Sequence, residues 1–502
     1  MRYDYIIIGG GLSGLVLGII LSKEKKKVLI LEQHLKAGGY LHSFYRNRHR
    51  FETGFHFVSE LSKDRILNYY WSYLGILDNL NLIPYNIEHF NSLIFPDDKY
   101  EIPAGLDNLE TYLIKVFPKE KDTIIKFIKK IREIKRYFVY FNRDHKGDID
   151  LEHKSFDINI NDFLDEIGTS KKLKSIILAH SFLYGVPPKE APLGTHAIFF
   201  NALYSQIYDI EGGGDALIKV LVETLRKNGG EILFSEKVVE IVTKDKKIDG
   251  VKTHSDKYYE GDNVVSSINP KVTLPLFTEK VFRGTFTDRI EEMENTLSHF
   301  GTYNISNGDI NLPSYDILYF PSYDIDDIYN RIVSNDFDDF FIYITSPTTR
   351  LEKSSGKHII ETLSIDDYKN YKRWEGSNSN KRDEDYNNFK KLISKKIIDK
   401  IYKIIPETKE NIENTYSSTP LTNYNYTLSP NGSIYGIKHN MKQMHAPIRA
   451  RTKLEGFYFT GQSLIFPGIV GVTITAFVTA AEILGEEYLF KKIDEEISIN
   501  KR

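Results

Sequence analysis

The sequence predicts an α/β fold in which a Rossmann-like nucleotide-binding domain is interleaved with a mixed α+β domain. Three observations support this prediction. Residues 3–32 read as strand, Gly-rich turn, helix and second strand. Residues 211–270 return to strand-and-helix patterning after a Gly triplet. Near the end of the chain, a strand runs into Gly461–Gln462 and an apolar helix follows Pro467. Strands that alternate with helices are typical of α/β domains.

The first segment has the pattern of a dinucleotide-binding βαβ unit. Residues 5–8 are an apolar run short enough for a buried strand, residues 12–21 fit a buried helix, and residues 27–31 fit a second strand. Glu32 stands at the end of that second strand, where its carboxylate can accept hydrogen bonds from ribose hydroxyls. This order of elements predicts that Glu32 binds an adenosine ribose without a 2′-phosphate.

Three glycines of this unit follow the G-x-G-x-x-G spacing. Gly9 permits a tight turn, Gly11 lets a pyrophosphate approach the backbone, and Gly14 lets the helix pack closely on the strand. The helix begins at Leu12 and Ser13, and its free N–H groups offer a partial positive charge to phosphates. An ordinary βαβ unit with a Gly-rich turn is the alternative, and the complete set of features disfavours it.

Composition limits the classes of function. The chain has 502 residues and a net charge of −3, so we expect no nucleic-acid partner. Because it has no cysteine, disulfides, thiolate catalysis, iron–sulfur clusters and Cys-ligated zinc are excluded, and we predict no metal site. The first strand begins within a few residues of Met1, which predicts a cytoplasmic protein without a signal peptide. Residues 464–484 are apolar but contain Pro467–Gly468 and several threonines, which favours a buried helix over a membrane span.

The segment after the βαβ unit is predicted to supply a second set of ligand contacts. It begins at Gln33 and contains Gly38 and Gly39, whose backbone can approach a phosphate or a planar ring. His42 and Ser43 follow as hydrogen-bond donors. A Gly-Gly pair alone would be a plain turn, but its place directly after a dinucleotide-binding unit favours a ligand contact.

Residues 46–57 are predicted to form a turn and a short strand that contains Gly54. A glycine inside a strand often marks the close approach of a ligand or of another backbone. His56 lies two residues further on and would face the same side as Gly54. A structural role and a functional role for His56 have equal support.

These motifs resemble those of a known family. GGGLSG, Glu32, GGYLHS and FETGFHF together are similar to the flavin-dependent phytoene desaturase superfamily, which includes retinol saturases and carotenoid isomerases. Members bind FAD, and they add, remove or rearrange hydrogens on long polyenes. The resemblance therefore implies FAD as cofactor, an apolar polyene or isoprenoid lipid as substrate, and an external electron donor or acceptor.

The C-terminal block strengthens the resemblance. In the superfamily, a Gly-Asp or Gly-Gln pair at the position of Gly461–Gln462 meets the ribityl chain or the pyrophosphate. The helix that Gly468 opens, with Ile469 and Val470 in its first turn, would point its N-terminus at the flavin O2/N1 edge. By the same resemblance, the backbone of Val238 lies against the adenine.

We expect the chain to visit two domains alternately. The FAD-binding domain is predicted to comprise residues 1–60, 206–270 and 440–490, and the substrate-binding domain residues 61–205 and 271–439. Residues 119–141 show helical apolar spacing with an excess of basic residues. We favour a helix packed on its own domain, and peripheral membrane contact is the alternative, because an apolar substrate must be collected from a membrane. Residues 367–388 are charged and Asn-rich, which predicts a solvated surface loop.

The resemblance implies hydride transfer between flavin N5 and a substrate carbon, while the protein supplies an apolar tunnel and orientation. Saturation also needs a proton donor. His56 is the first choice because it would lie beside Gly54, and Tyr435, in a stretch similar to retinol saturases, is the second. His196 is interpreted as a packed core histidine.

Three other activities stay open. They are redox-neutral isomerisation by reduced FAD, an amine or porphyrinogen oxidase activity, and non-catalytic binding of prenyl lipids as in Rab GDP-dissociation inhibitors. The lack of cysteine argues mildly against an amine oxidase with a tethered flavin. The Gly461–Gln462 and Pro467–Gly468 pattern favours a bound flavin over the non-catalytic protein. We find no second dinucleotide motif of similar quality, so no resident NAD(P) site is expected.

Overall fold

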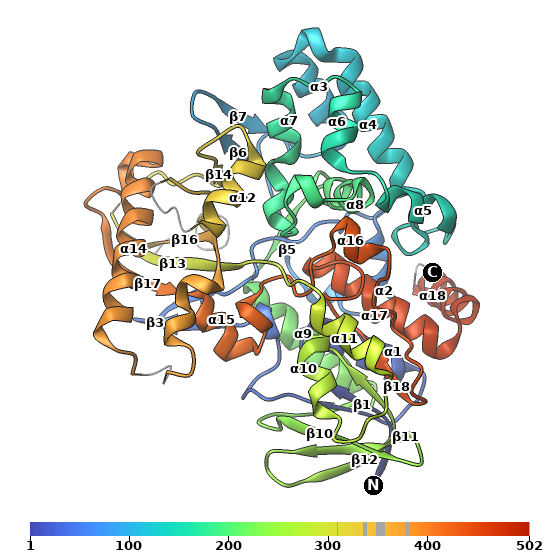
Figure 1. Cartoon of the computed structure of the whole chain (residues 1–502). Coiled ribbons are helices and arrows are strands. Elements are labelled where there is room, and N and C mark those ends of the chain that lie inside the picture. The colour runs from blue at the N-terminus through green and yellow to red at the C-terminus, as the bar shows by residue number, and fades with distance from the viewer. Residues whose placement is uncertain (309, 335–338, 348–356, 378–380, 501–502) are drawn as a thin grey trace.

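Two seven-stranded sheets organise the molecule (Figure 1). The computed structural model describes residues 1–500 except 309, 335–338, 348–356 and 378–380. Most of the described helices gather around the first sheet and on one side of the second, and the two sheets are joined through segments that cross between them several times (Figure 1).

The first sheet has the strand order β10-β11-β12-β1-β2-β9, with β18 beside β12. Parallel pairing of β1 with β2 and β12 creates the buried centre, so the residues of β1 and β2 are almost all apolar. Its strands are β1 (Arg2–Ile8), β2 (Val28–Leu31), β9 (Glu231–Leu233), β10 (Val238–Lys244), β11 (Lys247–Thr253), β12 (Tyr258–Ser266) and β18 (Phe457–Phe459). The strands expected at 5–8, 27–31 and 457–460 are confirmed to within a few residues.

Three helices pack beside this sheet: α1 (Leu12–Lys23), α9 (Gly213–Lys227) and α17 (Gly468–Leu484). Helix α1 contacts both others and is buried along nearly its whole length, which explains its lack of a polar face. The helices predicted to follow the first glycines, the Gly triplet and Pro467 are therefore confirmed.

The second sheet has the order β17-β13-β16-β15-β14-β6-β7. Helix α14 (Glu384–Ile404) covers one face with Ile393, Ile397 and Ile401. Strands β6 and β7 pair as an antiparallel hairpin. The strands are β6 (Asn91–Ile94), β7 (Lys99–Ile102), β13 (Ser298–Asn307), β14 (Asp316–Tyr319), β15 (Ile342–Thr345), β16 (Lys357–Asp366) and β17 (Ile412–Ser418).

The other elements connect or cover the two sheets. Strands β3 (Ser43–Arg46) and β4 (His49–Glu52) form a short hairpin, and β5 (Leu82–Pro84) forms a short antiparallel pair with the distant β8 (Tyr208–Ile210). The helices are α2 (Ile66–Leu74), α3 (Leu106–Val116), α4 (Lys121–Lys135), α5 (Ile149–Phe156), α6 (Ile160–Glu166), α7 (Lys171–Leu178), α8 (Leu193–Leu203), α10 (Pro270–Thr273), α11 (Gly284–Glu292), α12 (Ile325–Val333), α15 (Pro420–Thr427), α16 (Met441–Met444) and α18 (Glu486–Asn500).

Helix α4 is the basic amphipathic helix of the sequence. It buries its apolar side against α3 and α8, and Lys121, Lys126 and Lys129 face solvent. The residues that it buries are Ile124, Phe127, Ile128, Ile131 and Ile134. The expected packing on its own domain is confirmed.

No single helix among the described residues is long and apolar enough to cross a bilayer. Helices α17 and α18 satisfy the length and composition test only as a pair, and that pair is bent by 118°.

Two expectations about local structure are wrong. The strand expected to carry Gly54 ends at Glu52, because the chain then turns across Tyr40, and a Cβ on Gly54 would lie 2.7 Å from the Tyr40 backbone oxygen. His56 therefore does not share a strand face with Gly54.

Residues 367–388 are not a solvated loop. They contain a 3₁₀ helix, Tyr368–Trp374, that buries Tyr368, Tyr371 and Trp374, and they lead into α14; residues 378–380 lie outside the described residues. The Tyr371 hydroxyl donates to the Asp366 carboxylate over 2.5 Å. The three aromatic residues are spaced by three positions between charged residues. This spacing places them on one side of the 3₁₀ helix, and that side is buried.

Candidate active site

A cavity of 1840 Å³ lies where the carboxyl ends of β1 and β2 meet the start of α17 and the strands β13 and β17. Its lining includes residues 9, 11–13, 38–43, 460–463 and 467–470, which come from both ends of the chain. The predicted site residues that line the cavity are Gly9, Gly11, Leu12, Ser13, Glu32, Gln33, Gly38, Gly39, His42, Ser43, Gly54, His56, Val238, Tyr435, Gly461, Gln462, Gly468, Ile469 and Val470. Gly14 does not line it, because a Cβ there would lie 2.3 Å from the Gly9 oxygen, and its role is helix packing.

One part of the cavity is a cradle of backbone. Gly11 precedes α1, and a Cβ built on it meets no atom within 4 Å, so its position opens directly into the cavity. The Gly38 N–H donates to the Gly10 oxygen over 2.9 Å, and a Cβ built on Gly39 would lie 3.7 Å from the Gly11 Cα. Gly38 and Gly39 have φ values of +137° and +56°, which side chains disfavour. A pyrophosphate fits this cradle, since backbone N–H groups and the α1 N-terminus face it.

Glu32 is buried at the end of β2 beside the cradle. One carboxylate oxygen accepts the Gly10 N–H over 2.7 Å, and the other accepts the His34 N–H over 2.9 Å. Each oxygen retains a further lone pair, so Glu32 can hold the Gly-rich turn and still accept a ribose hydroxyl.

Replacing Glu32 by alanine is expected to lower the free energy of unfolding by about 2 kcal/mol, because two backbone N–H groups lose their acceptors in or beside the core. FAD should also bind more weakly. Urea unfolding measures the first effect and flavin content the second. Glu223→Ala on the exposed side of α9 is the matched control, and an equal loss of stability there would contradict this role for Glu32.

The second part of the cavity is formed by the C-terminal block. The Thr460 N–H donates to the Ser266 oxygen over 2.8 Å, and its hydroxyl lies 2.8 Å from that of Ser13. Gly461 has φ of +103°, and a Cβ there would lie 2.9 Å from the Ser267 oxygen, so glycine is required. The Gln462 backbone oxygen is within 3.0 Å of His439 Nε2.

Helix α17 directs its N-terminus at the cavity. Pro467 caps it without a side-chain hydrogen bond, and a Cβ on Gly468 would meet open space within 4 Å. The first-turn N–H groups are therefore free to bind an anionic or electron-rich group. Helices α1 and α17 thus present two positive ends to one cavity, and a dinucleotide with a separate electron-rich ring fits that arrangement.

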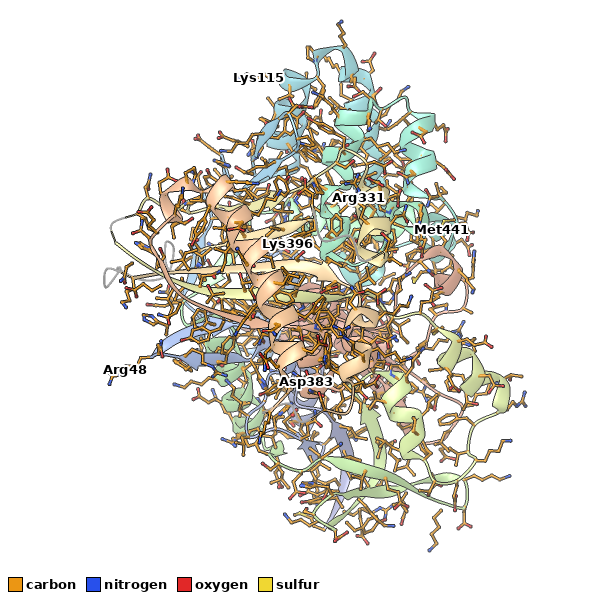
Figure 2. The ribbon with its side chains drawn as sticks, turned by 60° about the vertical axis from the view of Figure 1, so that its left-hand side comes forward. Arg48, Lys115, Arg331, Asp383, Lys396 and Met441 are labelled. Carbon is orange, nitrogen blue, oxygen red and sulfur yellow. The ribbon has the colours of Figure 1, made fainter. Side chains whose placement is uncertain are left out.

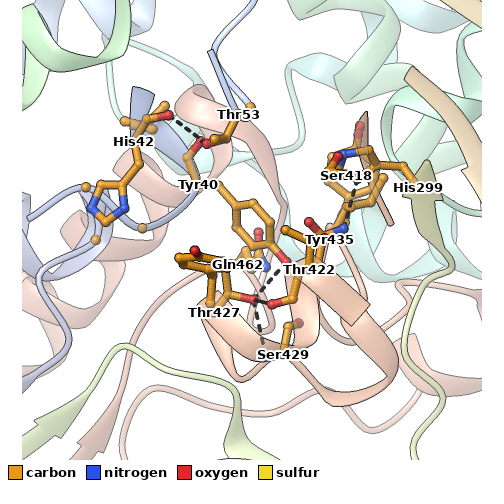
Figure 3. A pocket seen from close by; sticks show the side chains of 18 of the residues that line it. Tyr40, His42, Thr53, His299, Ser418, Thr422, Thr427, Ser429, Tyr435 and Gln462 are labelled. Carbon is orange, nitrogen blue, oxygen red and sulfur yellow. Dashed lines mark hydrogen bonds between the residues drawn. The ribbon is translucent and has the colours of Figure 1, made fainter. Parts of the chain in front are cut away.

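The space between these two parts is walled by Tyr40, Thr53, Tyr435 and Gln462 (Figure 3). The Thr53 hydroxyl bonds the backbone oxygens of His42, over 2.7 Å, and Tyr40, over 3.1 Å. The Tyr40 hydroxyl donates to the Ser433 oxygen over 2.7 Å. These bonds fix the wall without placing a charge in it, so a planar aromatic ring can lie there.

His42 and Ser43 are also bound within the protein. His42 Nε2 lies 3.1 Å from the Lys36 oxygen, and burial, with Lys36 and His34 nearby, lowers the pKa of His42. The Ser43 hydroxyl donates to the Asp215 carboxylate at the start of α9. Both residues line the cavity, and their direct contact with a cofactor stays a prediction.

The two predicted proton donors lie in the same cavity. The His56 ring centre is 5.1 Å from that of Tyr343 on β15, and the His56 oxygen accepts the Tyr85 hydroxyl over 3.2 Å. Tyr435 packs so closely on Gly185 that a Cβ there would be 2.8 Å from the ring. Burial raises the pKa of Tyr435, so its phenol stays protonated at neutral pH.

His299, on β13, is a cavity residue that the sequence analysis missed (Figure 3). Its Nδ1 lies 3.0 Å from the Asn423 amide nitrogen. Burial, and then the electrostatic effect of His56, lower the pKa of His299 to about 4, so it is neutral at pH 7. A single histidine in a polar strand carries no sequence signal, and only the fold brings it to His56.

The inner end of the cavity is an aromatic chamber, formed where α8 faces the segment around Tyr184. Phe199, Phe200 and Leu203 of α8 line it, and His196 is buried against Tyr184, whose hydroxyl lies 3.0 Å from His196 Nδ1. Burial lowers the pKa of His196 to about 3, so it is uncharged. His196 is a core histidine, as predicted, and the chamber suits a hydrocarbon.

A buried carboxylate lies beside the site. Glu52, at the end of β4, is 3.3 Å from the Arg50 guanidinium, and burial nevertheless raises the pKa of Glu52 to about 8. The unfolded chain, with an ordinary Glu pKa near 4.5, binds fewer protons than the folded protein between these values. Glu52 therefore stabilises the fold at acidic pH, and this contribution declines as pH rises from about 4.5 to about 8.

The change Glu52→Gln is expected to flatten this decline, because glutamine cannot ionise. Urea unfolding of both proteins at pH 5 and pH 8 measures it. Wild-type protein should lose more stability between the two values than the variant, and identical slopes would contradict the assignment.

Comparison with known proteins agrees with this geometry. The family model described as "Flavin containing amine oxidoreductase" matches residues 12–305. The chain is 24% identical to an all-trans-retinol 13,14-reductase of Danio rerio over 96% of this chain and 86% of that protein. It is 23% identical to prolycopene isomerase 2 of an Oncidium hybrid cultivar over 95% of this chain and 82% of that protein.

The fold is also similar to that of solved oxidoreductase structures. An oxidoreductase from Methanosarcina mazei superposes with a TM-score of 0.67 at 14% identity, covering 96% of this chain and 100% of that one. The nucleotide cradle and the two helix N-termini fit FAD, and the matched family is a flavin family. This chain therefore belongs to the flavin containing amine oxidoreductase family and is an FAD-dependent oxidoreductase.

Proposed function

We propose that this protein acts on carbon–carbon bonds of a long apolar polyene or isoprenoid lipid. One observation carries the proposal: a single cavity joins the nucleotide cradle to an uncharged aromatic chamber. An uncharged chamber does not suit a small charged amine. Its two histidines, His180 and His196, are neutral because burial lowers their pKa values to about 3. The retinol reductase and prolycopene isomerase among the similar proteins are named for polyene substrates of this kind.

When bound, FAD supplies hydride chemistry at its N5 atom. Residues of this chain do the remaining work. Gly11 and Gly39 hold the pyrophosphate, Glu32 holds the ribose, and the α17 N-terminus stabilises negative charge on the ring edge. Phe199 and Phe200 orient the hydrocarbon and exclude water from it. The domain limits expected from the sequence stay a prediction.

Saturation of a double bond also needs a proton on the second carbon. We assign this step to His56, with Tyr435 as the second choice, since both line the cavity near the ring wall. His299 is less suited to donate a proton, because it is neutral at pH 7 and a neutral imidazole is a weak acid. Its place beside His56 instead allows it to orient that ring.

The first experiment is the visible spectrum of the purified protein before and after anaerobic reduction. A flavin spectrum that bleaches is expected, and the reduced protein should then convert a polyene from a panel of retinoids and carotenoids. Mass spectrometry distinguishes saturation, which adds two hydrogens, from isomerisation, which leaves the mass unchanged. A colourless protein that refuses added FAD would contradict the proposal and favour a non-catalytic lipid-binding protein.

A further inference from the structure

The cavity has a second arm that the reaction above leaves unused. It leads from His299 and Ser418 past β17 to α14, and we call it the polar arm. Along it, Ser394 Oγ lies 3.1 Å from Ser417 Oγ and 2.8 Å from the Lys390 backbone oxygen. Its other lining residues include Asn387, Asn388, Tyr402 and Thr415. Hydroxyl and amide groups of this kind suit a hydrated ligand, whereas the aromatic chamber suits a hydrocarbon.

Cations surround the outer end of the polar arm. Arg46 on β3 and Lys390, Lys391 and Lys395 on α14 line it, and in the described part of the chain none of the four forms an ion pair. Burial, then the nearby Arg382 and Arg46, lower the pKa of Lys390. The acidic residues that line the arm are Glu384 and Asp399, which are exposed. The four cations outnumber these two carboxylates, and this excess of positive charge indicates a site for an anion.

The arrangement of these elements supports a small ligand. Figure 2 shows α14 with Lys396 at the front and Arg48 at the tip of the β3–β4 hairpin on the same side of the molecule. Cations from two elements, β3 and α14, therefore line the polar arm. A ligand with several phosphates can contact both sides and extend along the polar arm toward the cofactor.

We propose that the polar arm binds the phosphates of a water-soluble nicotinamide dinucleotide, whose reduced form supplies the hydrogens for saturation. This inference rests on the proposed function, because each saturated double bond consumes one hydride and one proton. The dihydronicotinamide would give up its hydride to the bound flavin, for transfer to one substrate carbon, and would become an aromatic pyridinium. The proton for the other carbon comes from His56, which solvent then reprotonates. Side-chain cations replace a second Gly-rich motif here, which is consistent with a ligand that binds and leaves in each cycle.

The test measures binding of NAD⁺ and NADP⁺ to the oxidised holoenzyme by calorimetry, with no polyene present. The double variant K391E/K395E is expected to raise the dissociation constant about tenfold, since two exposed cations become anions. Flavin content should stay unchanged. The control K126E/K129E makes the same charge change on the exposed side of α4 and should bind like wild type. Added salt should weaken wild-type binding.

Three results would overturn the inference. They are no binding of either dinucleotide at millimolar concentration, equal weakening in the α4 control, and loss of flavin in K391E/K395E, which would assign these cations to FAD. A separate binding assay uses vesicles of anionic lipid. If the vesicles bind the protein and neither dinucleotide does, these cations would form a membrane-facing surface instead. Because no polyene is used, failure here is distinguishable from failure to saturate a polyene.

Discussion

Replacing Gly11 by valine is expected to give a folded protein that no longer retains FAD. The Gly11 backbone is extended, and a Cβ there meets no protein atom within 4 Å, so the protein tolerates the side chain. The side chain instead occupies the cradle that the pyrophosphate needs. We expect FAD affinity to fall by at least about 100-fold, which corresponds to about 3 kcal/mol. Flavin content after gel filtration and a fluorescence titration with FAD measure the loss.

Gly14→Val is the matched comparison, because the two glycines belong to one motif. A Cβ on Gly14 would lie 2.3 Å from the Gly9 oxygen, so the helix and the turn must separate. This variant should lose thermal stability as well as FAD, whereas the Gly11 variant without FAD should melt close to the wild-type apoprotein. If Gly11→Val retained full FAD, the cradle would not be the pyrophosphate site.

The second large effect is expected from His56→Phe. If His56 protonates the second carbon, saturation should slow by about 100-fold or more, in line with general acid catalysis. FAD should stay bound, because His56 lies outside the cradle. Single-turnover oxidation of the reduced protein by the polyene measures the rate, and the flavin spectrum verifies the cofactor.

Tyr435→Phe distinguishes the two proton donors. It removes only a hydroxyl and keeps the ring that packs on Gly185. A large loss in this variant, with turnover preserved in His56→Phe, would transfer the role to Tyr435. The pH profile adds a second readout, since loss of an ionising donor changes its shape and loss of packing does not.

The cofactor half of the fold was predictable because its signals are local. Gly9, Gly11 and Gly14 stand between an apolar strand and an apolar helix, and each spacing is set by contacts within one βαβ unit. The Pro467–Gly468 pair likewise predicts the start of α17. Most predicted cofactor residues therefore line one cavity, although their contacts with FAD stay predictions.

The substrate half was less predictable because its contacts are long-range. His299 reaches the site through the pairing of β13 with β16 and β17, strands that no local pattern ties together. The sequence predicts a short strand through Gly54, but the chain turns across Tyr40 there and the strand ends at Glu52. The polar arm depends on α14 meeting β17, and its lysines read in isolation as an ordinary solvated helix face.

The closure of the first sheet also has a consequence for synthesis of the protein. Helix α1 is buried on all sides, partly by α17, and β18 joins the sheet only after almost the whole chain has been translated. At about 5–20 residues per second, tens of seconds separate the emergence of α1 from that of α17. During this interval the nascent chain exposes an apolar helix, so chaperones are expected to bind its N-terminal segment. Ribosome-stalled chains that stop before β18 should be protease-sensitive there.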